Sequence, residues 1–153
     1  MRIDRQQKWH YQGTPINRQR MVRLFSTVLR RESDDEYYLV TPVEKCRIEV
    51  EDVPFEAILL EVEGEGEAQQ LRLTTNVADE VAVDTQHPLR IETDPVSGEP
   101  SPYVLVRGRL EARLARSVFY QLVEKAVQVS LDGTDWLGVW SGGVFFKLME
   151  LDE

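Results

Sequence analysis

The chain has 153 residues, of which 42% are hydrophobic and 29% charged, and its formal net charge is −9. This length supports one substantial core, or two small lobes that share one, in an ordinary soluble globular protein. No apolar run approaches the roughly 20 residues that span a membrane, Met1 does not open a signal-peptide pattern, and a single cysteine, Cys46, excludes an internal disulfide. A cytoplasmic protein is therefore expected.

The first half of the chain combines short strand patterns with one amphipathic helix. The predicted elements are a hairpin over Arg2–Asp4 and Lys8–Tyr11, a helix over Ile16–Arg31, and strands at Tyr37–Val40, Val43–Val50, Phe55–Glu63 and Gln70–Thr75. Asn17 is a suitable N-cap for the helix. Alternation puts Cys46 on the apolar face of its strand, which predicts a core residue rather than a nucleophile.

The second half repeats this mixture. The predicted elements are strands at Val81–Asp84, Leu89–Thr93 and Tyr103–Val106, a helix over Leu114–Val129, and a closing hairpin over Trp136–Trp140 and Val144–Met149. Asp94–Pro102 holds three prolines and a glycine, which predicts a mobile or ligand-covering loop.

The fold class expected from these elements is α+β, with two mostly antiparallel β lobes and one principal helix in each. The approximate lobes are residues 1–80 and 81–153. They are expected to pack as one compact unit, because no linker is long enough to separate independent domains.

The two helical stretches also point to an internal duplication. Ile16–Arg31 aligns without a gap on Leu114–Val129, and Arg18 falls on Arg116. Each of these two arginines lies in or beside the apolar stripe of its helix. One interpretation is that each pairs with a carboxylate of this acidic chain. The other is that both point into a groove between the halves and bind a phosphate or carboxylate ligand bidentately.

Charge is distributed unevenly along the chain. Residues 1–31 carry a net charge of +7, whereas the remainder carries −16. The simplest interpretation is that the basic segment packs against the acidic body. The alternative is that the basic face of the first helix meets an acidic partner; that face consists of Arg20, Arg23, Arg30 and Arg31. General nucleic-acid binding is not expected, because the acidic body would repel the phosphate backbone.

The residues contain no catalytic, metal or cofactor signature. Two histidines and one cysteine are too few for a structural zinc site, and no calcium-loop spacing is present. Trp140–Gly143 favours a plain hairpin turn over an anion-binding nest of backbone N–H groups. Ser141 has no evident histidine and aspartate partners, so a hydrolase is not expected.

Eight segments spread over nearly the whole chain resemble the bacterial family known as domain of unknown function 1285. They are LFSTVLRRE (24–32), YYLVTPVEK (37–45), VEDVPF (50–55), TNVADEV (75–81), HPLR (87–90), GEPSPYVLVRG (98–108), RSVFYQLVEKA (116–126) and GVWSGGVFF (138–146). The resemblance implies a duplicated α+β core with a pleckstrin-homology-like C-terminal half. It also implies a groove between the halves that suits a small anionic or nucleotide-like ligand, and a role in signalling.

Within or beside these segments lie nine residues able to meet a polar ligand. They are Arg18, Lys45, Asn76, Tyr103, Arg107, Arg116, Tyr120, Trp140 and Ser141. Aromatic rings with cations suit a base stacked beside a phosphate, and they suit an ordinary interface between lobes equally well. The leading hypothesis is a non-enzymatic ligand-binding or signalling adaptor protein. The alternative is a protein–protein interaction module that uses the basic helix face, and a nucleotide-processing enzyme is least favoured because no motif positions a general base.

Overall fold

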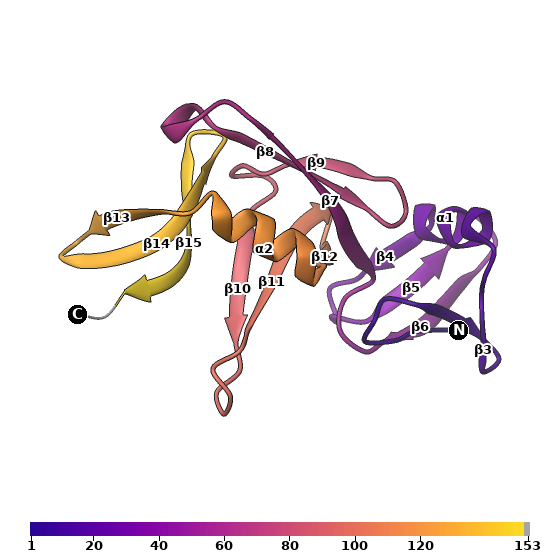
Figure 1. Cartoon of the computed structure of the whole chain (residues 1–153). Helices are drawn as coiled ribbons and strands as arrows, with labels where there is room; N and C mark the ends of the chain where they lie inside the picture. Colours follow the sequence, from indigo (N-terminus) through magenta and orange to yellow (C-terminus); the bar gives the residue numbers. More distant parts are fainter. Residues whose placement is uncertain (152–153) are drawn as a thin grey trace.

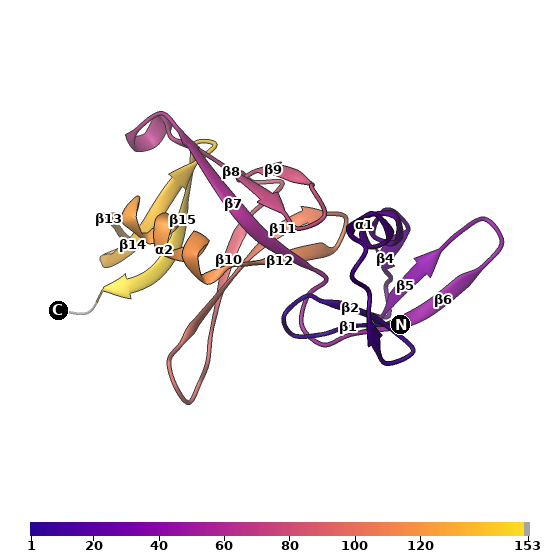
Figure 2. The same ribbon diagram turned by 45° about the vertical axis from the view of Figure 1, so that its right-hand side comes forward.

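Three β-sheets and two short helices make up residues 1–151, the part of the chain that this computed structural model describes. Figures 1 and 2 both show the sheets in a row, with the N-terminal sheet at one end and the C-terminal sheet at the other. The fold is therefore α+β, as the sequence predicts. Neither of the two helices, each of nine residues, meets the length and hydropathy of a membrane span.

The first sheet contains strands β1 to β6 in the order β3-β2-β1-β6-β5-β4, with a parallel pair, β1 and β6, at its centre. Its elements are β1 (Arg2–Ile3), β2 (Trp9–Tyr11), β3 (Thr14–Pro15), α1 (Gln19–Thr27), β4 (Leu29–Arg31), β5 (Tyr37–Val40) and β6 (Lys45–Val50). Helix α1 connects β3 to β4 and lies over this sheet (Figure 1).

The second sheet has the order β10-β11-β12-β7-β8-β9, again with a central parallel pair, β7 and β12. Its elements are β7 (Phe55–Glu63), the single 3₁₀ turn η1 (Gly66–Ala68), β8 (Gln70–Thr75), β9 (Glu80–Ala82), β10 (Leu89–Thr93), β11 (Pro100–Arg107) and β12 (Leu110–Leu114). The chain thus changes sheet between Val50 and Phe55. The approximate boundary predicted after residue 80 lies within β9, which pairs with β8. Below, the first lobe denotes β1 to β6 with α1, and the second lobe denotes the elements from β7 onward.

The third sheet is an antiparallel meander that follows the second helix. Its elements are α2 (Arg116–Glu124), β13 (Val127–Leu131), β14 (Thr134–Ser141) and β15 (Val144–Leu151). Two-residue turns with positive φ join these strands, at Asp132-Gly133 and at Gly142-Gly143. Such primed turns match the twist of the strands that they connect. The Gly142-Gly143 turn confirms the plain hairpin predicted there.

The same arrangement of elements surrounds both helices. Each helix follows one three-stranded antiparallel meander and precedes another, and the first of the six strands lies beside the last. In the first copy β1 pairs with β6, and in the second β10 lies alongside β15. The duplication predicted from the two helical stretches is therefore confirmed. The meander β7-β8-β9 has no counterpart in the first copy.

Both helices are shorter than the sequence predicts. The predictions of helix up to Arg31 and up to Val129 are wrong, because α1 ends at Thr27 and α2 at Glu124. The residues that follow form β4 and β13, which pair with β5 and β14. Pairing with a neighbouring strand here outweighs helical periodicity. Arg18, not Asn17, is the N-cap residue of α1.

One hydrophobic core runs through all three sheets. Among its fully buried side chains are Ile3 and Trp9 of the first sheet, Phe55 and Leu71 of the second, and Val139 of the third. Burying a large apolar side chain stabilises the fold by about 1.5–3 kcal/mol. The buried side chains of the three sheets thus belong to one cluster.

Two local predictions meet different outcomes. Cys46 is exposed, so its placement in the core is wrong: the β5–β6 hairpin extends beyond the core, and the cysteine Sγ lies 2.9 Å from Glu44 Oε1.

Asp94–Pro102 forms the end of the β10–β11 hairpin, where Asp94 accepts hydrogen bonds from the N–H groups of Val96 and Ser97. Its role as a ligand cover stays a prediction.

Candidate anion-binding cleft between the lobes

A cavity of about 890 Å³ opens between the first and second sheets. One wall is α1 with β4, and the other is the β8–β9 and β11–β12 turns. We call this cavity the arginine cleft, because its lining within residues 1–151 contains six arginines and one carboxylate, Asp79. The arginines are Arg20, Arg23, Arg30, Arg31, Arg107 and Arg109.

Local structure explains why these cations converge. Arg20 and Arg23 are three residues apart on α1, so they lie on the same side of the helix. Arg30 and Arg31 follow on β4, immediately after the helix ends. Arg107 and Arg109 flank Gly108, whose φ of +54° makes the tight β11–β12 turn. Both lobes therefore contribute charge to the cleft.

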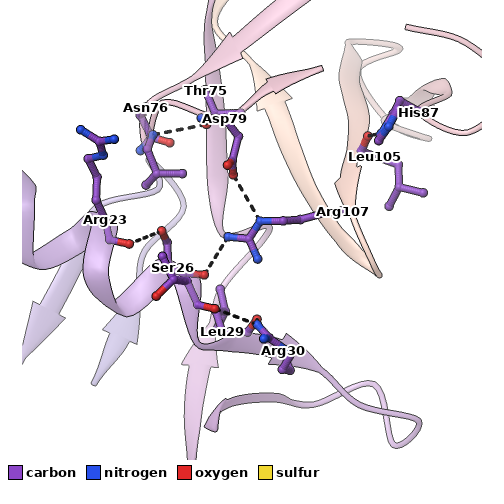
Figure 3. A network of polar contacts seen from close by, with 12 residues as sticks. Arg23, Ser26, Leu29, Arg30, Thr75, Asn76, Asp79, His87, Leu105 and Arg107 are labelled. Atoms are coloured by element: carbon purple, nitrogen blue, oxygen red, sulfur yellow. Dashed lines mark hydrogen bonds and ion pairs between the residues drawn. The ribbon is translucent and has the colours of Figure 1, made fainter. Parts of the chain in front are cut away.

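Arg107 ties the two lobes together at the back of the cleft (Figure 3). Its Nη2 donates to the backbone oxygen of Ser26 at 2.7 Å, and its Nε lies 3.4 Å from a carboxylate oxygen of Asp79. The guanidinium also lies 5.4 Å from the centre of the Phe55 ring. Ser26 belongs to the last turn of α1, where free carbonyl groups and the helix dipole favour a cation.

Two further arginines bind backbone oxygens on this wall, Arg30 at the end of α1 and Arg109 just after β4. Arg30 Nη1 donates to the oxygens of Thr27 and Leu29, at 3.0 and 2.7 Å. Arg109 crosses from the second lobe to the backbone oxygen of Glu32 and to the carboxylate of Asp35. Its hydrogen bond and charge hold the pKa of Asp35 below the ordinary value. These contacts fix the cleft wall, while the side chains of Arg20 and Arg23 remain exposed.

The prediction that Arg18 and Arg116 point into one groove is wrong. Both side chains are exposed, and none of the cavities found within residues 1–151 is lined by both. Arg116 and Tyr120 instead border a second cavity, of about 600 Å³, between the β1–β2 turn and α2. Burial of Glu56 in its wall raises the pKa of that carboxyl above the ordinary value. Whether Arg18, Arg116 or Tyr120 binds a ligand stays a prediction.

Of the nine residues singled out in the sequence, only Arg107 lines the arginine cleft. Asn76 lies beside it and has structural contacts: its backbone oxygen accepts from the Gln19 side chain, and its Oδ1 accepts from the N–H of Glu56 at 3.1 Å. Lys45 is exposed, paired with Glu32 at 3.1 Å. The structure therefore does not bring the nine residues together.

The other three residues lie in or near the core. Tyr103 is buried, and its hydroxyl donates to the Asp52 carboxylate at 3.0 Å. Trp140 is half-buried against Phe145, with ring centres 5.3 Å apart. Ser141 is fully buried and hydrogen-bonded. Ser141 therefore cannot be the exposed anion ligand that a nest would need.

Two family models match this chain, and they divide it where it passes from the first sheet to the second. Residues 1–53 match the family described as "Domain of unknown function (DUF1285), N-terminal domain". Residues 54–148 match "Protein of unknown function (DUF1285), C-terminal domain". The chain belongs to the DUF1285 family. The two family segments meet where the chain passes from β6 to β7.

Two solved DUF1285 structures resemble this one. A family protein from Silicibacter pomeroyi DSS-3 is 51% identical, with a TM-score of 0.89, over 99% of this chain and 80% of that one. A family protein from Shewanella baltica OS155 is 28% identical, with a TM-score of 0.64, over 81% of this chain and 90% of that one. No curated protein matches the chain. The pleckstrin-homology-like character of the C-terminal half stays a prediction.

The sequence did carry a signal for the cleft of this DUF1285 protein. The basic face predicted on the first helix, for which the sequence offers an acidic partner as an alternative, forms one wall of the arginine cleft together with β4. Arg109 is not among the residues predicted from the sequence, because its contact with the first lobe depends on how β11 and β12 pack.

Tyr103 provides a pH-dependent prediction. Burial, with the hydrogen bond to Asp52, raises the pKa of Tyr103 to about 12, from an ordinary value of 10.0. The folded state thus holds this proton more tightly than the unfolded state. Its contribution to stability is fully present below pH 10 and is lost as the pH rises towards 12. When the free energy of unfolding is measured between pH 9 and 12, Tyr103→Phe should show less of this pH dependence than the wild type. Tyr120→Phe, at an exposed position, should keep it.

Proposed function

We propose that this chain is a non-enzymatic binding protein that holds a small molecule with phosphate or carboxylate groups in the arginine cleft. The observation that carries the proposal is the excess of arginines over carboxylates in the cleft: six arginines and Asp79 line it within the described part of the chain. The volume of about 890 Å³ falls within the roughly 300–1,000 Å³ of small-molecule pockets. Arginine recognises phosphate and carboxylate groups bidentately, which suits it to this task.

The charges of the four cleft arginines on α1 and β4 remain available, whereas Arg107 and Arg109 pair with Asp79 and Asp35. Residues 1–31 contain eight lysines and arginines, yet Arg2, with Glu51, is the only one whose side chain forms an ion pair within the described chain. The basic segment therefore packs against the rest of the chain, as in the β1–β6 pairing, without broad ion pairing among the described residues. A positive cleft on a protein of net charge −9 would concentrate anions locally.

The lining also limits the chemistry of the ligand. Leu24, Leu29, Val77 and Leu110 supply an aliphatic surface, and within residues 1–151 no aromatic side chain lines the cleft. A nucleotide would have to rest its base on aliphatic groups rather than stack it on a ring. Anionic groups, rather than a base, are thus expected to dominate recognition, so sugar phosphates and polycarboxylates belong beside nucleotides in any search.

The polar groups that line the cleft favour a binding protein over an enzyme. A general base needs a free carboxylate, imidazole or amine near the ligand. The carboxylate in the lining belongs to Asp79, which forms an ion pair with Arg107. Among the described residues, the lining contains no histidine, lysine or cysteine. A nucleotide-processing enzyme therefore remains the least favoured function.

The test is a thermal-shift screen of nucleotides, sugar phosphates and polycarboxylates, followed by calorimetric titration. A ligand at 100 times its Kd adds about 2.7 kcal/mol to the stability. The double variant Arg20→Gln and Arg23→Gln should bind at least tenfold more weakly, because both side chains line the cleft without ion pairs. Arg18→Gln is the matched control outside the cleft and should bind normally. Equal binding by all three proteins, or no hit in the panel, would overturn the proposal.

An acidic protein segment is the second candidate ligand for the same surface. Leu24 is 65% exposed and Met21 39% exposed on α1, beside Arg20 and Arg23. Apolar side chains between cations suit an amphipathic acidic segment better than a small anion. Met21→Ser separates the candidates, because Met21 is exposed on α1 but does not line the cleft. It should preserve small-anion binding and weaken the binding of a protein partner.

A further inference from the structure

The three sheets have six end strands, and five of them are protected against pairing with another chain. β3 has two residues, one of them Pro15, and β9 has three, including exposed Glu80. β10 and β15 lie beside each other. β4 carries two arginines, and Arg109 binds the backbone oxygen of Glu32, the residue that follows it. Short length, proline, charge and cover are the usual ways in which proteins prevent edge-to-edge pairing.

The sixth end strand, β13, has none of these protections. Its five residues, Val127–Leu131 (VQVSL), include no charge, proline or glycine. β14 is its partner on one side, and the order of the sheet ends at β13 on the other. The contrast with β4 is informative, because the two strands follow equivalent helices in the duplication and only β4 is charged.

The hairpin geometry shows which backbone groups face outward. Asp132 and Gly133, with φ of +51° and +82°, form a type I′ turn between the paired residues Leu131 and Thr134. Such a turn closes on a hydrogen-bonded pair, and hydrogen-bonded pairs alternate with non-bonded ones along the ladder. The N–H and C=O groups of Val127 and Val129 therefore face β14, and those of Gln128 and Ser130 face the open edge.

We propose that the open edge of β13 is a self-association surface on which a second copy of this chain adds its own β13, antiparallel, about a two-fold axis at Val129. Gln128 of each copy then forms a hydrogen-bonded pair with Ser130 of the other. Val129 meets its own equivalent, and Val127, which is 42% exposed, meets Leu131 of the second copy. The interface is isologous and closes as a dimer.

The charged residues at the two ends of β13 are complementary in this antiparallel register. Lys125 precedes β13 and Asp132 follows it, and neither forms an ion pair within residues 1–151. Antiparallel pairing about Val129 places Lys125 of one copy beside Asp132 of the other, at both ends of the interface. The strand between them is neutral, so no like charges are brought together.

The first test is molar mass by light scattering across a concentration series of the full chain. The wild type is expected to approach twice the monomer mass as concentration rises. Gln128→Pro should stay monomeric, because proline removes an outward-facing N–H and leaves the β14 ladder intact. Gln128→Thr keeps that N–H and should dimerise. A monomeric wild type at every concentration would overturn the proposal, as would a Gln128→Pro dimer.

The second test fixes the register by cross-linking in a Cys46→Ser background. Val129→Cys places two cysteines in a non-hydrogen-bonded antiparallel pair, with Cα atoms about 4.5 Å apart, which a disulfide can span. Ser130→Cys is the control, because each copy of residue 130 faces residue 128 of the other. Oxidation should cross-link the first variant and not the second. Equal cross-linking of both, or of neither, would contradict the two-fold arrangement.

Discussion

Replacing Gly138 by alanine is expected to lower the free energy of unfolding by about 3 kcal/mol or more. An added Cβ would lie 2.3 Å from the backbone oxygen of Phe146 and 2.5 Å from the ring of Phe145. The site is a register shift in the β14–β15 ladder, so the backbone cannot move away without disturbing its pairing. Chemical denaturation of both proteins measures the difference.

Gly143→Ala is the matched control for this substitution. Gly143 belongs to the same β14–β15 hairpin, and an added Cβ there meets no atom within 4 Å. Its cost comes only from the left-handed backbone, with φ at +77°, and is expected to be about 1–2 kcal/mol. If the two variants were equally stable, the close approach at Gly138 would not limit the packing of this hairpin.

Local sequence patterns were sufficient for some strands and turns, such as the closing hairpin. Alternation of apolar and polar residues predicts Val144–Met149, and the structure has β15 there. The pair Gly142-Gly143 predicts a tight hairpin, because positive φ at both positions is costly for other residues. These features depend on neighbours in the chain, which the sequence displays directly.

The ends of the helices and the place of Cys46 depend on neighbours that are distant in the chain. Leu29 has helical periodicity, but it pairs with Leu39 in β4 and β5. Cys46 has the alternation of a core residue, but its end of the β5–β6 hairpin extends past the core. In both cases the tertiary arrangement overrides a correct local pattern.

The arginine cleft shows the same limit at the level of the site. A helical wheel recovers Arg20 and Arg23 as one basic face, because both belong to a single element. Arg107 and Arg109 reach that face only because the β11–β12 turn packs against the end of α1 and the β4–β5 turn. A candidate site between the lobes therefore cannot be predicted from one element alone, because it depends on how the two lobes pack together.

Ser141→Ala is expected to lower the free energy of unfolding by about 2–3 kcal/mol. The Ser141 Oγ accepts from the N–H of Leu71 at 2.9 Å and donates to the oxygen of Val83 at 2.6 Å, joining the third sheet to the second. All three residues are fully buried, so alanine would leave an amide and a carbonyl without partners and away from water.

Ser117→Ala is the control for this loss, since Ser117 is exposed on α2 and alanine favours helices. It should change stability by less than about 0.5 kcal/mol. Hydrogen exchange adds a local measurement, because the Leu71 amide should lose protection in Ser141→Ala and keep it in Ser117→Ala. Unchanged protection at Leu71 would mean that the third sheet docks through its apolar contacts, such as Val139, rather than through this buried hydroxyl.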